Sequence, residues 1–157
     1  MAFRISSPAF ADGAAIPVRQ TCDGDDRSPL LTWFDAPEGT RSYVLLMEDP
    51  DAPRGTFTHW VLYDIPAVTT ELGKNVPDGT VGISGRNSFG RTGYGGPCPP
   101  PGHGAHRYTF TLHALDVSSL AVAKDAARDE VEKEMAGHVL GMAQLVGKYE
   151  RQGTGVT

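Results

Sequence analysis

The sequence lacks any apolar stretch long enough to cross a membrane as a helix, so no stable membrane insertion is expected. It also lacks a concentration of positive charge: the 14 Lys and Arg are scattered and the net charge is −5. Because neutralising phosphates requires clustered basic residues, nucleic acid is not an expected partner. The first residues, "MAFRISSPAFADG", lack the basic start and apolar segment of an export signal, which predicts a cytoplasmic protein.

Cysteine is scarce as well. Cys22 and Cys98 are the two cysteines, and they lie far apart in the chain without a CxxC pair. Disulfides are rare in a reducing cytoplasm. We therefore expect both side chains to be free, reduced thiols.

Glycine and proline, in contrast, are abundant, with 19 and 12 residues in a chain of 157. This composition favours many turns and short strands over a helical bundle. A chain of this length is most simply one domain, residues 1–157, which buries about 70% of its unfolded surface without needing a disulfide.

Apolar periodicity predicts a series of strands. They fall at residues 3–5, 16–22, 31–33, 43–47, 57–65, 106–115 and 143–151. A hairpin is the simplest link between 43–47 and 57–65. In the strand 106–115, alternation places His106, Tyr108, Phe110 and Leu112 on one face and Arg107, Thr109, Thr111 and His113 on the other.

A helical pattern comes late in the chain. The apolar residues that repeat at helical spacing are Ala127, Val131, Met135, Val139 and Met142. Many strands followed by one amphipathic helix favour an α+β, mainly β fold, or a β-sandwich-like core with peripheral helices. Residues 85–104, with seven Gly and four Pro, exclude regular structure, and loops of this length are commonly functional.

Unusual polar residues gather at the ends of the predicted strands. Asp49 and Asp51 lie in the turn "DPDAP", His59 lies early in the following strand, and "GHGAHRY" ends the Gly/Pro-rich loop. If these segments meet at one edge of a sheet, Asp49, His59 and His106 line one pocket. Its rim would be stiffened by prolines 50, 53, 97, 99, 100 and 101.

Other interpretations of the same residues stay open. "DPDAP" alone is typical of a tight turn, and His59 alone could be a hydrogen-bonded histidine of a sheet. His103, His113 and His138 are taken as structural. Cys98, His106 and an Asp could form a thiol hydrolase, and two histidines with a carboxylate could hold a metal ion. The chain could also be an interaction protein with a vestigial pocket.

Taken together, six segments resemble the phosphatidylethanolamine-binding protein family, in the bacterial and archaeal branch called Raf kinase inhibitor-like. They are "SPAFADG", "TCDGDDRSPLLTW", "EDPDAP", "THWVLYDIP", "YGGPCPPPGHGAHRY" and "LHALD". The resemblance runs from about Phe3 to Arg151. Its most specific part is the combination of the DPDAP element with the G-x-H-R-Y element about fifty residues later and a histidine between them.

The resemblance implies a large antiparallel sheet packed on a smaller sheet, one or two peripheral helices, and a small anion pocket at one edge. It assigns the pocket to Asp49, His59 and His106. Asp51 and Pro53 would shape the turn, Gly96 and Pro97 would lie at the rim, and Tyr108 would be the aromatic neighbour.

The expected function is therefore binding rather than catalysis. The ligand would be phosphate, a phosphomonoester or a phosphorylated headgroup, bound without a cofactor or metal. A protein partner, with a kinase as one example, and a homodimer are further expectations. Two imidazoles can donate hydrogen bonds to phosphate oxygens, but Asp49 repels an anion, so a charged histidine or a proton on Asp49 must compensate.

Overall fold

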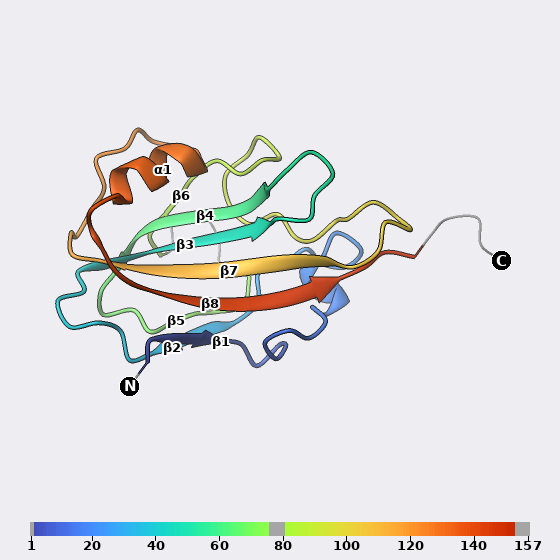
Figure 1. Cartoon of the computed structure of the whole chain (residues 1–157), viewed down its shortest axis with the longest axis horizontal. Helices are drawn as coiled ribbons and strands as arrows, with labels where there is room; N and C mark the ends of the chain where they lie inside the picture. Colours follow the sequence, from blue (N-terminus) through green and yellow to red (C-terminus); the bar gives the residue numbers. More distant parts are fainter. Residues whose placement is uncertain (1, 76–80, 153–157) are drawn as a thin grey trace.

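Strands dominate the computed structural model, which describes residues 2–75 and 81–152. Figure 1 shows them running side by side along the long axis of the molecule. The elements in chain order are β1 (Arg4–Ser6), the 3₁₀ helix η1 (Val18–Gln20), β2 (Leu31–Phe34), β3 (Ser42–Asp49), β4 (Phe57–Pro66), β5 (Glu71–Leu72), β6 (Ile83–Ser84), β7 (His106–Leu115), α1 (Arg128–Met135) and β8 (Val139–Tyr149). No helix in these residues is long and apolar enough for a membrane span.

Two antiparallel sheets organise the described chain. The larger has the strand order β6-β4-β3-β7-β8 and the smaller has the order β1-β2-β5. Strand β3 occupies the centre of the larger sheet, as its nearly continuous apolar run "YVLLM" requires. It pairs with β4 as the predicted hairpin partner and with β7 on its other side.

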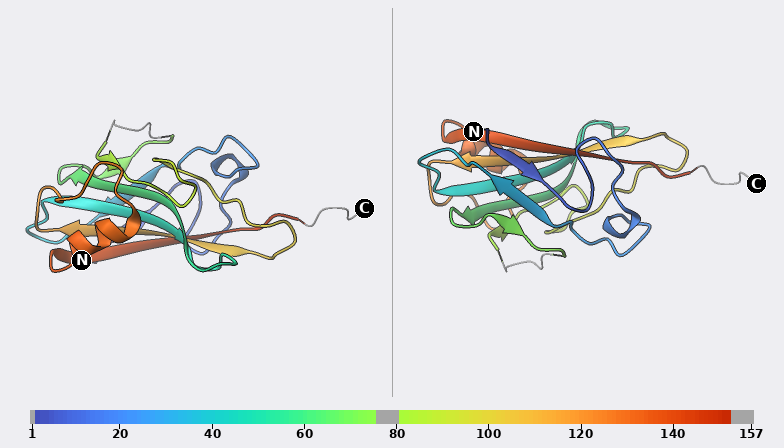
Figure 2. Two further views of the ribbon diagram at one scale, coloured as in Figure 1. Left: turned by 90° about the horizontal axis from the view of Figure 1, so that it is seen from above. Right: turned by 90° about the horizontal axis from the view of Figure 1, so that it is seen from below.

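The core has two parts, one on each face of the larger sheet. Between the sheets, Ile5, Leu31 and Trp33 pack with residues of the larger sheet such as Leu45 and Phe110. On the opposite face, Val131 and Met135 of α1 pack against a second set that includes Val44 and Val61. Figures 1 and 2 show the larger sheet between α1 and the smaller sheet. The predicted mainly β class, a large antiparallel sheet packed on a smaller one, is confirmed.

Two predicted elements are wrong in kind or length. Residues 16–22 do not form a strand, because Pro17, with φ of −60°, begins the 3₁₀ turn Val18–Gln20. The helix ends at Met135, so Val139 and Met142 belong to β8. Gly137, with φ of +84°, follows the last turn, and this left-handed conformation is a common helix terminator.

The Gly/Pro-rich loop, residues 85–104, contains no regular strand or helix, as predicted. It nevertheless follows β4 closely. The amides of Gly85, Ser88 and Gly95 donate to carbonyl oxygens of Val61, Thr58 and His59 at 2.8, 2.8 and 2.9 Å. The loop is therefore placed along one side of β4 by backbone hydrogen bonds.

The expectation of two reduced thiols is wrong. Cys22 and Cys98 form a disulfide with Cα atoms 5.4 Å apart. The expectation rested on a presumed reducing compartment. It did not include the path of the Gly/Pro-rich loop, which brings Cys98 next to Cys22 in the turn after η1. The disulfide joins segments 76 residues apart in sequence.

This bond gives a direct chemical prediction. Denatured protein that has not met a reductant should contain no free thiol, and two should appear after reduction. The Cys22→Ala/Cys98→Ala double variant should lose about 2–4 kcal/mol of unfolding free energy, because the unfolded chain gains entropy without the link. Thiol titration and urea unfolding measure the two effects, and two thiols in the unreduced protein would contradict the structure.

Candidate functional site

A β-bulge in strand β4 sets the direction of His59. Met47 of β3 pairs with Trp60 and Glu48 pairs with Thr58, so His59 is the extra residue on β4. Bulges change the direction in which a side chain points. The His59 ring accordingly lies 5.2 Å from the ring of Tyr108, which belongs to the core between the two sheets.

Asp49 joins the turn after β3 to the start of β7. Its Oδ2 atom lies 2.7 Å from Nδ1 of His106, and its Oδ1 atom accepts a hydrogen bond from the Asp51 amide at 2.8 Å. Both side chains are nearly inaccessible to solvent, at 4% for Asp49 and 2% for His106. Because a carboxylate can only accept, His106 donates from Nδ1.

His106 is also bound from the loop side. Its Nε2 atom lies 2.6 Å from Nδ1 of His103, which the sequence analysis had taken as structural. When His106 is neutral with its proton on Nδ1, Nε2 accepts and His103 donates. The result is a hydrogen-bonded chain from His103 through His106 to Asp49.

His59 is held by the backbone of the Gly/Pro-rich loop. Its Nδ1 atom lies 2.7 Å from the Gly95 carbonyl oxygen, which can only accept, so Nδ1 carries a proton. Burial lowers the pKa of His59 below its usual value, and the Gly95 carbonyl and the charge of Asp49 oppose the shift only in part. His59 is therefore neutral near pH 7, with an unprotonated Nε2.

These side chains line a cavity of about 230 Å³ at the end of the larger sheet. Five of the predicted site residues contribute to it: Asp49, Pro53, His59, His106 and Tyr108. Pro99 and Pro100 from the predicted rim also line it. The structure thus brings together the turn, the bulged strand and the HRY segment.

The Tyr108 hydroxyl is a buried polar group of this cavity without a hydrogen-bond partner of good geometry. Burial raises the pKa of Tyr108 well above its usual value, and the nearby charge of Asp49 adds to the shift. The hydroxyl consequently keeps its proton. Asp49 lies close enough to interact with this hydroxyl through a side-chain hydrogen bond, although not in good geometry.

Three predicted residues lie outside the lining. Asp51 receives hydrogen bonds from the amide, Nε and Nη2 of Arg107 at 2.8, 3.0 and 2.8 Å, and these bonds lower the pKa of Asp51 to about 2. Gly96 donates its amide to Asp26 at 2.8 Å, and Pro97 accepts from the Cys22 amide at 3.1 Å. All three support the walls of the cavity from behind.

Sequence reasoning missed several lining residues. Phe57 and Phe89 form an edge-to-face pair with ring centres 4.8 Å apart, and Ala52 and Cys98 complete the lining. Phe57 pairs with Asp49 across the strands, so its position follows from the hairpin once the register is known. Phe89 lies in an irregular loop, where no periodic pattern indicates which way a side chain points.

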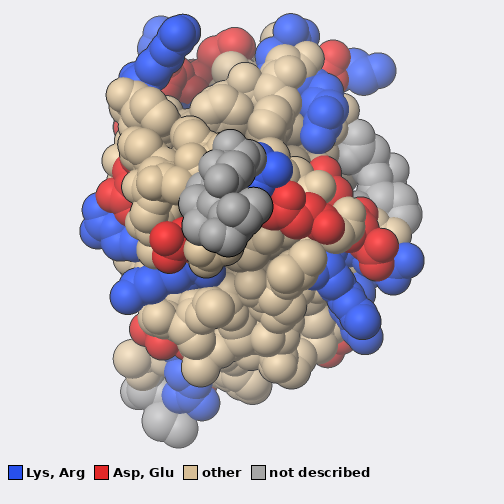
Figure 3. Space-filling model, turned by 90° about the vertical axis from the view of Figure 1, so that its right-hand side faces the viewer, with Lys and Arg blue, Asp and Glu red and all other residues tan. Residues whose placement is uncertain are grey.

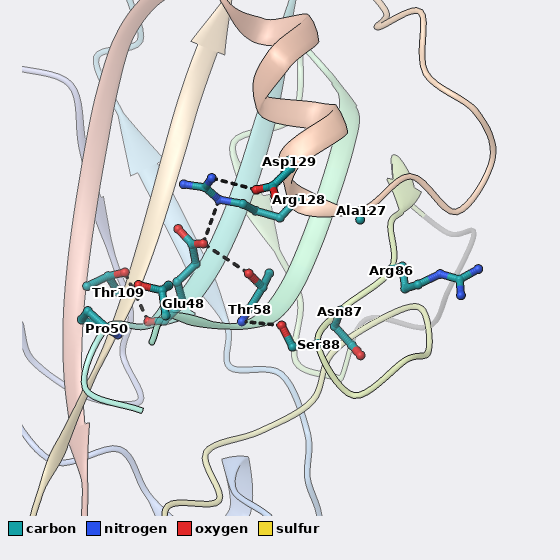
Figure 4. A pocket seen from close by; sticks show the side chains of 11 residues that line it. Glu48, Pro50, Thr58, Arg86, Asn87, Ser88, Thr109, Ala127, Arg128 and Asp129 are labelled. Carbon is teal, nitrogen blue, oxygen red and sulfur yellow. Dashed lines mark hydrogen bonds and ion pairs between the residues drawn. The ribbon is translucent and has the colours of Figure 1, made fainter. Parts of the chain in front are cut away.

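A larger cavity of about 580 Å³ lies on the opposite face of the sheet, beside α1 (Figure 4). Its centre is an ion pair in which Arg128 Nε lies 3.0 Å from Glu48, and Glu48 also accepts from the Thr58 hydroxyl at 3.3 Å. Arg128 has a second partner in Asp129. The charged groups at this centre satisfy one another, so we place the candidate site in the smaller cavity.

Two catalytic alternatives find no support in the described residues. Cys98 is bonded to Cys22 and has no thiol to act as a nucleophile. Within residues 2–75 and 81–152, no three His, Cys, Asp or Glu side chains are arranged to hold a metal ion.

Charge on the site's end of the molecule is mixed. Figure 3 views the side toward which β8 runs, the same end of the sheet at which β3 ends and β7 begins. On this face Lys and Arg alternate with Asp and Glu around a largely uncharged surface. The charge visible on this face is therefore mixed rather than a broad field of one sign.

The two packed sheets, with a polar cavity at the end of the larger one, define a small, mainly β fold. The family model described as phosphatidylethanolamine-binding protein matches residues 6–150, and the chain belongs to this family. A similar curated protein is the UPF0098 protein of Aquifex aeolicus, 53% identical over 150 residues, covering 94% of this chain and 88% of that protein.

Two solved structures are also similar. CT736 of Chlamydia trachomatis, described as a phosphatidylethanolamine-binding protein homologue, has a TM-score of 0.88 and 34% identity, covering 96% of this chain and 99% of its own. E. coli YbcL, described as a new member of the mammalian family, has a TM-score of 0.89 and 31% identity, covering 97% and 100%. These relatives share the whole described fold.

Gly96 provides a test of the cavity wall. A Cβ atom there would collide with the Gln20 carbonyl oxygen and the Asp26 carboxylate, so Gly96→Ala should lower the unfolding free energy by about 1–3 kcal/mol. Gly73→Ala is the matched control, since its Cβ would meet no atom within 4 Å, and its effect should stay within about 0.5 kcal/mol. Equal urea midpoints for the two variants would contradict the wall geometry.

The buried histidines predict how stability depends on pH. Burial lowers the pKa of His59 and of His113, so the unfolded chain binds more protons than the folded protein below about pH 6.5. The unfolding free energy should therefore fall as the pH decreases from 7 toward 5. His113→Gln, which removes one of these groups, should show a smaller fall in urea unfolding series, and an unchanged fall would contradict the assignment.

Proposed function

We propose that the cavity lined by Asp49, His59, His106 and Tyr108 binds a small anion, with phosphate or a phosphomonoester as the expected class. The observation that carries the proposal is a cavity lined by two buried histidines, His59 and His106, beside the buried side chains of Asp49 and Tyr108. Phosphate oxygens accept hydrogen bonds from hydroxyl and imidazolium groups.

The size of the cavity suits such a group. A water molecule occupies about 30 Å³ in the liquid. About 230 Å³ therefore accommodates a tetrahedral anion with a short substituent. Phe57, Phe89 and the prolines supply apolar walls that would contact the substituent.

The protonation state of the His59 and His106 rings decides whether the cavity attracts an anion. In the neutral rings, Nδ1 of each histidine donates to Gly95 or Asp49, so Nε2 presents a lone pair. A lone pair repels a phosphate oxygen, as does the charge of Asp49. Adding a proton to either ring converts Nε2 into a charged donor and offsets Asp49. At His106 the anion would take the place of His103 at Nε2.

We expect binding to strengthen as the pH falls from about 8 to about 6. Burial keeps His59 mostly neutral in the free protein, but the anion binds the protonated ring, and the protonated fraction rises as the pH falls. A phosphomonoester loses charge on its second ionisation near pH 6, which partly opposes the trend. The gain of a donor should outweigh this loss. NMR titration of the histidine rings with inorganic phosphate at several pH values measures both the affinity and the proton uptake.

Variants locate the site. His59→Ala and His106→Ala should each remove most phosphate binding, whereas His113→Ala should retain it, because His113 lies on the other face of the sheet and bonds to the Val44 carbonyl. Perturbation of His113 or His138 by phosphate, with His59 and His106 unchanged, would show that the anion binds elsewhere.

The same chemistry has several natural sources. Free phosphate, a phosphorylated headgroup and a phosphorylated side chain of a protein partner, a kinase among them, all present similar oxygens. We propose binding rather than catalysis; the thiol hydrolase considered for Cys98 loses its nucleophile because that cysteine is bonded to Cys22.

The cytoplasmic location is likewise a proposal. The disulfide counts against it, because such bonds persist mainly in oxidising compartments. Fractionation of cells with an antibody to this chain decides between the cytoplasm and an oxidising compartment.

A further inference from the structure

One wall of the cavity is formed by residues 95–100 of the Gly/Pro-rich loop. Gly95 is bound to His59 twice, through its amide to the His59 carbonyl oxygen at 2.9 Å and through its carbonyl to Nδ1 at 2.7 Å. Cys98, Pro99 and Pro100 then line the cavity itself. The segment belongs to neither sheet, so its position depends on individual contacts.

The outer side of this wall is held by the turn at residues 21–26. The Cys22 amide donates to the Pro97 carbonyl oxygen at 3.1 Å, and Asp26 accepts from the Gly96 amide at 2.8 Å. The Cys22–Cys98 disulfide is the covalent link among these contacts. It lies closer to the lining prolines than either hydrogen bond, because Cys98 directly precedes them.

The turn is itself fixed to the end of β8. Asp23 accepts a hydrogen bond from the Tyr149 hydroxyl at 2.5 Å and pairs with Arg151 at 3.2 Å. The turn therefore provides a firm anchor for the wall through Cys22. Cutting the disulfide would release Cys98 from that anchor while leaving the anchor in place.

The disulfide is also accessible to a reductant. Cys22 and Cys98 are both exposed, and Nη1 of Arg151 lies 3.7 Å from Sγ of Cys98. A guanidinium group stabilises a thiolate, which makes Cys98 the better leaving group when a thiol attacks Cys22.

We propose that the Cys22–Cys98 disulfide is a redox switch for the anion cavity. In the oxidised protein it fixes the wall at residues 95–100 in the binding arrangement, and thiol reductants loosen that wall. The inference rests on the proposed anion-binding function and adds its regulation. After reduction, hydrogen bonds alone hold the wall, so they open more often and the wall occupies the binding arrangement for a smaller fraction of the time; the apparent affinity falls by that fraction.

The redox step is ordinary thiol–disulfide exchange with a dithiol. A thiolate of the dithiol attacks Sγ of Cys22 and forms a mixed disulfide, while the Cys22–Cys98 bond breaks and its electron pair leaves on Cys98. The second thiol of the dithiol then displaces Cys22 and closes a cyclic disulfide. Two electrons and two protons pass to the protein, which gains two thiols.

The test compares phosphate binding to the oxidised protein, to the protein reduced with dithiothreitol, and to Cys22→Ser. Reduction should weaken binding about tenfold, as expected if the loosened wall is competent about a tenth of the time. Cys22→Ser leaves every lining residue in place, so it should bind like the reduced protein and should not respond to dithiothreitol. Equal affinity of the oxidised and reduced proteins would overturn the proposed switch.

A second measurement separates this inference from the proposed function. Amide hydrogen exchange at Gly95 and Gly96 should accelerate on reduction, while the Gly85 amide, bonded to Val61 in the same loop, should be unchanged. If the oxidised protein binds no phosphate, the proposed function fails, and exchange alone then decides whether the disulfide controls the wall. If the exchange rates of Gly95 and Gly96 are also unchanged by reduction, the proposal that the disulfide holds the wall is rejected as well.

Discussion

The candidate site depends on the joining of the DPDAP turn to the start of β7 by two carboxylates. Asp49 binds His106, and Asp51 binds Arg107. Two neighbouring residues at the start of β7 therefore bind the two aspartates of the turn. Because neighbouring side chains of a strand point to opposite faces, one pair is buried at the cavity and the other lies near solvent. The solvent-facing pair fixes the turn, and the buried pair presents the polar group that a ligand would meet.

Much of this arrangement could be predicted from the sequence. Strand β7 alternates from His106 to Leu112, which correctly predicts that His106 and Tyr108 share the face of Phe110. The combination of DPDAP with HRY then indicates which strand ends meet. Motifs succeed here because the residues that bind each other are local to strand termini, where turn chemistry restricts the backbone.

The remaining features depend on contacts that no local pattern contains. Simple alternation along β4 would place His59 on the face of Val61, and only the bulge directs it toward Tyr108. The disulfide depends on the path of an irregular loop, so compartment reasoning gave the wrong state for Cys22 and Cys98. The helix was overextended because Val139 and Met142 continue its spacing by coincidence, while Gly137 ends it.

The pairing of β3 with β7 also has a kinetic consequence. These strands are adjacent in space although about sixty residues separate Glu48 from its partner Thr109, so the chain must close a long loop before they meet. Such non-local pairing is characteristic of slow folding. The cavity cannot exist in a partly assembled chain, because Asp49 and His106 belong to different sides of that loop. Any ligand of the cavity would therefore bind only the finished fold and would shift the folding equilibrium toward it by mass action.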